Sequence, residues 1–117
     1  MDIFRHAEAT DVPAGTAIFR AGDPGDQLYA IQEGRVELRL DNRVLAVLGP
    51  GEIFGEMALV EEAPRSATAV ALETCRIAFI DRKRFLFLVQ NTPYFSLEVM
   101  KIMAARLRGM DEKFRRL

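Results

Sequence analysis

Short apolar runs separated by turn residues follow one another from 17 to 80. Within this region, apolar and charged residues alternate over 36–41, as in a strand with one buried face. Asp41-Asn42 then leads into a second apolar run at 44–48, which predicts a hairpin. No stretch in this region keeps the helical spacing of apolar residues for long enough to form a helix of any size. We therefore expect an all-β unit of about seven or eight strands.

Glycine and proline clusters mark where the other predicted strands end. The stretch 22–26 (Gly-Asp-Pro-Gly-Asp) separates strands at 17–20 and 28–31, and Gly49-Pro50-Gly51 ends the hairpin. Two further runs, 67–72 and 75–80, complete the series. So many short strands are typical of a sandwich or of a roll that closes on itself.

After Asp81 the spacing of apolar residues changes from that of strands to that of helices. Asp81 is a suitable N-cap for a short helix over 82–90. Pro93 can open a second, longer helix that continues to 117. Apolar residues on this helix are spaced by three and four, as in the a/d seam of a coiled coil: Met100, Met103, Leu107, Met110, Phe114 and Leu117. Such a seam could pack on the β unit, but it extends further than a small roll can cover. We expect a homodimer through residues 100–117.

Composition and charge narrow the class of protein. The chain has 117 residues, of which 50% are hydrophobic and 28% charged, the balance of one globular domain. Sixteen basic and seventeen acidic residues give a net charge of −1, which provides no positive field for a nucleic acid backbone. The single cysteine and single histidine exclude a Cys/His metal site, and no apolar run reaches membrane-spanning length. These features predict a cytoplasmic protein with no metal, no membrane association and no direct DNA binding.

The segment 51–68 interrupts the strands and carries the candidate chemistry. Helix formers at 56–60 follow Gly55, which predicts one or two helical turns whose N–H groups would face an anion. Arg65 returns nearby and could bind the same anion, while Glu56 could accept hydrogen bonds from hydroxyls. Taken singly, these residues are more often a turn glycine, a surface cation and a solvated carboxylate. Together, a phosphate site beside a hydroxyl site predicts a nucleotide. The glycine spacing fits neither a dinucleotide fingerprint nor a P-loop.

Residues 54–67, with the sequence F-G-E-M-A-L-V-E-E-A-P-R-S-A, resemble the phosphate-binding cassette of cyclic-nucleotide-binding domains. These domains occur in catabolite-activator-type regulators, protein kinase A regulatory subunits and cyclic-nucleotide-gated channels. The likeness extends over about residues 12–115 and includes other matching turn and strand positions: Gly22, Asp26, Tyr29, Gly34 and Gly51. It implies a mainly β fold, namely an eight-stranded β-roll or jelly roll (double-stranded β-helix). It also implies a single domain over 1–117, with the roll at about 10–81 and C-terminal helices at about 82–116.

The resemblance also implies a role for each cassette residue. Arg65 would pair with the exocyclic oxygens of the cyclic phosphate, the Ala58 N–H and Ser66 would complete that contact, and Asp26 would orient Arg65. Glu56 with Gly55 would hold the ribose 2′-hydroxyl. The implied ligand-binding set is Gly55, Glu56, Met57, Ala58, Arg65, Ser66 and Ala67. Ser66 matches the catabolite-activator branch of the family, and no metal or other cofactor is implied.

Two features of this sequence differ from the catabolite-activator branch of the family. The chain ends at Leu117, without the helix-turn-helix domain through which those regulators bind DNA. Met110 and Asp111 stand where the branch has small hydroxyl residues that contact adenine. They are therefore the candidate base contacts, and Asp111 could accept from adenine or from the two adjacent donors of guanine. We expect cAMP rather than cGMP as the ligand.

Three classes of function compete. The leading hypothesis is a non-enzymatic cyclic nucleotide sensor that signals through its C-terminal helices, with a separate effector protein as a possible partner. The alternative is a dimerisation scaffold with a vestigial cassette, although the retained Gly55, Glu56 and Arg65 argue against it. An enzyme would need clustered histidines or a nucleophile and base, and the sequence offers neither.

Overall fold

The computed structural model describes residues 8–115, without the side chains of Ala58, Val60, Glu61 and residues 106–115. The chain forms two compact units, Met1–Arg82 and Lys83–Leu117. Eight strands and three helices lie within the described residues. The strands and the first helix belong to the first unit, and the two C-terminal helices account for the second.

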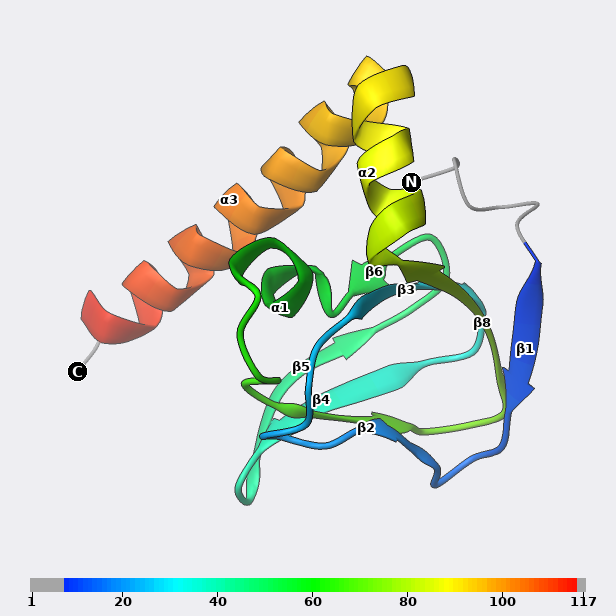
Figure 1. The fold of residues 1–117 in the computed structure, drawn as a ribbon. Helices are drawn as coiled ribbons and strands as arrows, with labels where there is room; N and C mark the ends of the chain where they lie inside the picture. The colour runs from blue at the N-terminus through cyan, green and yellow to red at the C-terminus, as the bar shows by residue number, and fades with distance from the viewer. Residues whose placement is uncertain (1–7, 116–117) are drawn as a thin grey trace. The chain divides into compact units, whose positions relative to one another are not determined.

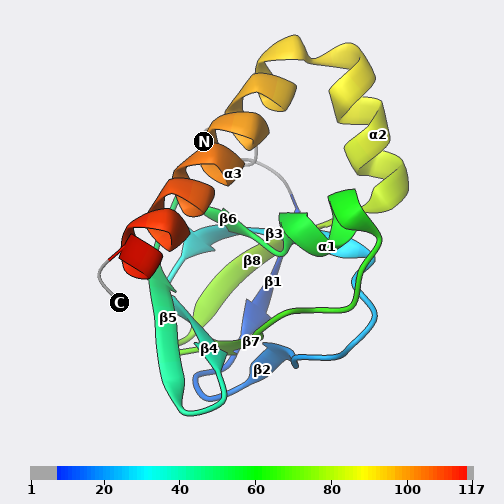
Figure 2. The same ribbon diagram turned by 90° about the vertical axis from the view of Figure 1, so that its left-hand side faces the viewer.

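The first unit consists of two four-stranded antiparallel sheets (Figure 1). One has the order β1-β8-β3-β6, from β1 (Ala9–Val12), β3 (Gln27–Glu33), β6 (Ile53–Phe54) and β8 (Cys75–Asp81). The other has the order β2-β7-β4-β5, from β2 (Ala17–Phe19), β4 (Val36–Leu40), β5 (Arg43–Leu48) and β7 (Thr68–Ala71). Figure 2 shows β4 and β5 as the predicted hairpin, with Leu40 paired to Arg43. The expected eight-stranded β-roll is confirmed, although the sequence pattern indicated no strand at β1.

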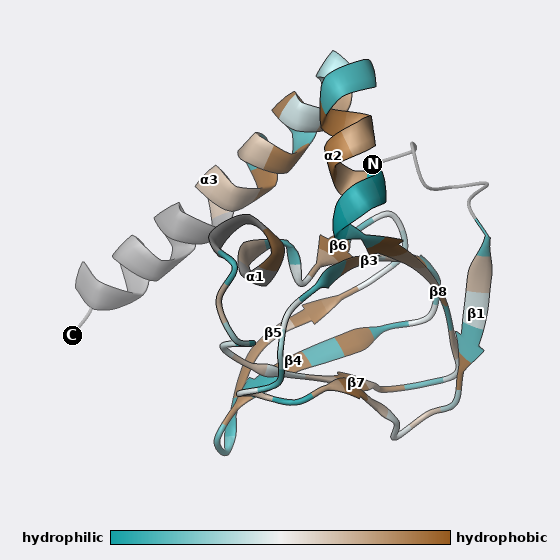
Figure 3. Cartoon of the chain, viewed as in Figure 1, coloured by the Kyte–Doolittle hydropathy of each residue, from teal (hydrophilic) through white to brown (hydrophobic). Residues whose placement is uncertain are grey.

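Alternation along the strands places one face of each sheet in the core. On β8, Cys75 and Ile77 are buried and Arg76 between them is exposed, and Figure 3 shows the same alternation of hydropathy along β4. The core cluster draws on both sheets: Val12, Phe19, Tyr29, Ile31, Val36, Leu48, Phe54, Ala69, Ala71, Cys75 and Ile77. Burying each large apolar side chain contributes roughly 1.5–3 kcal/mol, so this interior holds the sheets together.

Two helices follow the last strand, α2 (Arg82–Asn91) and α3 (Pro93–Arg115), as the Asp81 and Pro93 signals predict, and all their residues after Arg82 belong to the second unit. Thr92 separates the helices, and its N–H donates to the Leu88 carbonyl at 2.8 Å. The rings of Phe85 and Phe95 meet edge to face with centroids 5.5 Å apart, which joins the two helices. On α3, Met100 of the predicted seam is 58% exposed, whereas the Leu107, Met110, Phe114 and Leu117 side chains lie outside the described part of the chain.

Candidate functional site

The candidate site is built around α1 (Glu56–Glu61), the short helix that the sequence predicts between two strands. Gly55, with φ +82°, turns the chain from β6 into this helix. Glu62 has φ +56° and ends the helix in the left-handed conformation, a common way for a helix to stop. The chain then returns through Pro64 to Arg65, so the two ends of the cassette meet.

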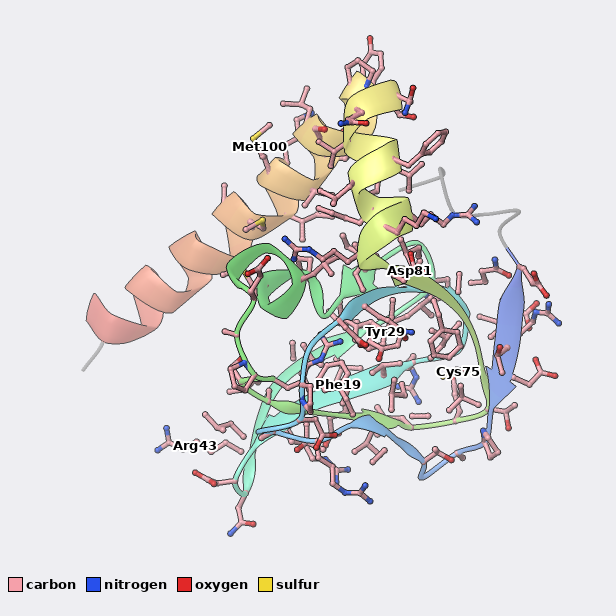
Figure 4. The ribbon with its side chains drawn as sticks, in the orientation of Figure 1. Phe19, Tyr29, Arg43, Cys75, Asp81 and Met100 are labelled. Carbon is pink, nitrogen blue, oxygen red and sulfur yellow. The ribbon has the colours of Figure 1, made fainter. Side chains whose placement is uncertain are left out.

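Arg65 is the central side chain of this site. It is 4% exposed, and both terminal nitrogens donate to main-chain carbonyls: Nη1 to Gly55 at 2.7 Å and Nη2 to Gln27 at 2.6 Å. Its Cζ lies over the Phe19 ring, 4.3 Å from the centroid, and 5.4 Å from the centroid of Tyr29. Figure 4 shows Phe19 and Tyr29 near each other inside the roll. The guanidinium is therefore fixed by two acceptors and two aromatic rings.

The Arg65 cation lacks an anionic partner among the described residues. Its Nε atom is buried without a hydrogen bond, and no ion pair joins the guanidinium to a carboxylate in the part of the chain described. A buried charge held only by neutral groups costs free energy that an opposite charge would offset. This geometry is suited to binding a small anion.

The main chain of Arg65 is fixed by the loop between β2 and β3. Its N–H donates to the Asp23 carbonyl at 2.8 Å, and its carbonyl accepts from the Gly22 N–H at 2.8 Å. The Thr68 hydroxyl accepts from the Ala21 N–H at 3.0 Å. This hydrogen bond ties the loop to the start of β7, the strand that follows Arg65, so segments distant in the sequence position the cassette arginine.

Gly55 leaves room for that arginine. A Cβ atom at this position would lie 2.7 Å from Arg65 Nη1 and 3.1 Å from Tyr29 Cδ2, and the positive φ disfavours any other residue. Gly55 is therefore required both by the turn and by the close approach of the guanidinium.

Two more titratable groups line this region. The Glu56 side chain is fully buried at the start of α1, in contrast to an ordinary solvated first-turn carboxylate. Burial raises the pKa of Tyr29 above its ordinary value, while the nearby Arg65 cation acts in the opposite direction.

The other predicted site residues occupy different environments. Ala67 is buried, Met57 is half-buried, and Ser66 and Asp26 are exposed. Asp26 forms no hydrogen bond or ion pair with Arg65 among the described residues, so its orienting role stays a prediction. The Ala58, Met110 and Asp111 side chains lie outside the described residues.

Two contributors to the site were missed by the sequence analysis: the Phe19 ring and the Gln27 carbonyl. Any residue supplies a carbonyl, so no residue type could have indicated Gln27. In the sequence, Phe19 resembles any core residue of a strand, and its contact with Arg65 joins segments that are far apart along the chain. Neither contributor leaves a local signal.

A metal centre and a membrane-spanning helix are two other features that can be compared with the described residues. Among them, no group of three or more His, Cys, Asp or Glu side chains is placed to share a metal ion. Within the same residues, the helices lack the combination of length and hydropathy that crossing a membrane requires.

The fold and the site together define the class of this protein, a β-roll domain whose internal helix adjoins a buried arginine. The chain belongs to the cyclic nucleotide-binding domain family, whose sequence profile matches residues 9–92.

Named relatives agree with this assignment. The chain is 40% identical over 104 residues to the "Cyclic AMP receptor protein" of Thermus thermophilus, a match that covers 85% of this chain and 48% of the relative. It superposes on the crystal structure of the Thermus thermophilus Catabolite Activator Protein with a TM-score of 0.84 at 38% identity, covering 92% of this chain and 53% of that one. The chain thus spans about half the length of these relatives.

A second similar structure is that of the EAL enzyme Bd1971. Its cAMP-bound form matches with a TM-score of 0.69 at 36% identity and covers 89% of this chain and 29% of that enzyme. Its cGMP-bound form matches with a TM-score of 0.67 at 37% identity and covers 86% of this chain and 28% of the enzyme.

Proposed function

We propose that this chain is a non-enzymatic sensor domain that binds cAMP in preference to cGMP. The observation that carries the proposal is the buried Arg65 cation, whose Nε atom has no hydrogen-bond partner and which pairs with no carboxylate among the described residues. A cyclic phosphate carries one negative charge, matching this single desolvated cation. The name of the Thermus thermophilus relative supports cAMP as the ligand.

The proposed roles of the cassette residues are those that the family resemblance implies, and the burial of Arg65 and Glu56 supports them. Arg65 binds the exocyclic phosphate oxygens, and the Ala58 N–H and Ser66 complete that contact. The buried Glu56, together with Gly55, holds the ribose 2′-hydroxyl. The chemistry of this arrangement is recognition of a phosphate and a hydroxyl by charge and hydrogen bonding. No metal takes part in these proposed contacts.

The bound state would be transmitted through α2. Arg82, the first residue of α2, donates from Nη1 to the Leu59 carbonyl of α1 at 2.8 Å and forms an ion pair with Glu62. A displacement of α1 on ligand binding would therefore act directly on the start of α2. We propose that this shift changes the position of the C-terminal helices, through which the domain dimerises and contacts a separate effector.

Calorimetric titration with cAMP and cGMP, without added metal, tests the proposed function. Wild-type protein should bind cAMP more tightly, and Arg65→Ala should weaken binding by roughly 1.5–3 kcal/mol through loss of charge-assisted hydrogen bonds. Arg43→Ala is the control, because Arg43 is an exposed arginine on the β4–β5 hairpin and its loss changes net charge equally (Figure 4). Equal affinity in wild type and Arg65→Ala would contradict the site. Failure of wild type to bind either nucleotide would favour the dimerisation scaffold.

A further inference from the structure

The side chains beneath Arg65 carry an inference that rests on the proposed function and deepens it. The Phe19 ring lies under Cζ at 4.3 Å, closer than the Tyr29 ring at 5.4 Å, and Phe19 is itself 9% exposed. The attraction between a cation and an aromatic face is strongest where both groups are removed from water. We infer that Phe19 is a positioning residue for the anion site, which holds the Arg65 guanidinium in its binding conformation before the ligand arrives.

An unrestrained arginine side chain adopts many rotamers, and restricting it to one of them during ligand binding would lower the affinity. Here two carbonyls hold Nη1 and Nη2, and the aromatic ring covers one side of Cζ. Together these contacts select one orientation and leave Nε without a protein partner. The two carbonyls belong to the main chain, and Phe19 is the nearer of the two rings, so a substitution at 19 removes the nearest side-chain contact of the guanidinium.

Phe19 also belongs to the larger aromatic cluster of the core. Its ring centroid is 5.6 Å from that of Tyr29 and 6.0 Å from that of Phe54, while the Tyr29 and Phe54 rings stack at 5.0 Å. An aliphatic residue at 19 would fill the core almost as well, because the apolar contacts need no π face. A leucine at this position therefore separates the positioning role from simple packing.

The first experiment measures cAMP affinity by calorimetry and stability by urea unfolding in a set of matched variants. Phe19→Leu and Phe19→Met should raise Kd about three- to thirtyfold, whereas Phe19→Tyr, which keeps the ring, should stay within about twofold of wild type. Ile77→Val is the packing control, since Ile77 is fully buried in the same core cluster on β8 and should leave Kd unchanged. Wild-type affinity in both aliphatic variants, or an equal loss in Ile77→Val, would overturn the inference.

The second experiment uses protein without ligand and so separates this inference from the proposed function. The ¹⁵N–¹H signal of Arg65 Nε, assigned by its disappearance in Arg65→Lys, should be resolved in wild type and in Phe19→Tyr. It should broaden or vanish in Phe19→Leu as the guanidinium becomes mobile. An unchanged signal in Phe19→Leu refutes the positioning role even if cAMP binds. A lost signal supports that role even if wild type binds no nucleotide, in which case the proposed function alone fails.

Discussion

Arg65 Nη1 donates to the carbonyl of Gly55 at 2.7 Å, and a Cβ atom on Gly55 would lie 2.7 Å from that same nitrogen. The missing side chain and the arginine that occupies its space are ten residues apart in the sequence. The turn into α1 and the position of the cation therefore depend on each other, and a change at Gly55 acts directly on the Arg65 guanidinium.

Gly55→Ala should therefore reduce both cAMP affinity and the stability of the fold. The methyl group would displace the guanidinium, and we expect cAMP affinity to fall by about 1.5 kcal/mol or more, together with about 1–2 kcal/mol of left-handed backbone strain. Gly15→Ala is the matched control, because Gly15 has φ +83° and nothing lies within 4 Å of its virtual Cβ. Calorimetry and urea unfolding check both variants. A loss of affinity in Gly15→Ala as large as that in Gly55→Ala would contradict the prediction.

The buried Glu56 carboxylate should discriminate between ribose and deoxyribose ligands. Glu56→Gln should weaken the binding of cAMP by about 1.5–3 kcal/mol, the range of a hydrogen bond to a charged group. The binding of 2′-deoxy-cAMP should be weakened much less. Titrations of both ligands provide the comparison, with Glu33→Gln, an exposed carboxylate at the end of β3, as the control. If both ligands lose the same affinity, Glu56 does not hold the 2′-hydroxyl.

Tyr29 should make folding sensitive to alkaline pH. Because burial raises its pKa in the folded state, the unfolded chain ionises first, and stability is lost as pH rises beyond the ordinary tyrosine value of about 10. Stability below that pH should be independent of this group. Tyr29→Phe should flatten the alkaline decline by up to about 1.4 kcal/mol per pH unit.

Urea unfolding between pH 8 and 11 measures that slope. Tyr94→Phe is the control, since Tyr94 is 79% exposed and the substitution should leave the wild-type slope in place. The same slope in wild type and Tyr29→Phe would show that Tyr29 is not the group responsible.

The predicted seam on α3 should hold two copies together. Replacing Leu107 and Phe114 with glutamate would place like charges at the proposed dimer axis, and the protein should become a monomer by light scattering at micromolar concentration. Lys101→Glu with Ala105→Glu is the control, because these exposed residues lie on α3 outside the seam.

Dimerisation should also affect nucleotide affinity. Met110 and Asp111 are the candidate base contacts on the same helix, so the monomeric variant should bind cAMP more weakly although its cassette is intact. A wild-type monomer would contradict dimerisation through this helix. A monomeric variant with full affinity would contradict the coupling between dimerisation and nucleotide binding.

Local chemistry was enough to predict most of the secondary structure. Alternation over 36–41 and the Asp41-Asn42 turn predicted the β4–β5 hairpin, and Pro93 predicted the start of α3. These signals depend on residues adjacent in the chain. The strand β1 escaped prediction because its four residues, Ala-Thr-Asp-Val, carry too little alternation, and its register with β8 is set by pairing across the sheet.

The sequence by itself was enough to indicate the family, because a glycine, a short run of helix formers and an arginine follow one another at the spacing of a phosphate-binding cassette. Only the tertiary structure decided how Arg65 is held. The Gln27 carbonyl and the Phe19 ring reach it from β3 and β2, and the loop 20–26 fixes its main chain. Contacts between segments so far apart depend on closure of the roll, which brings strands into contact regardless of their separation along the chain.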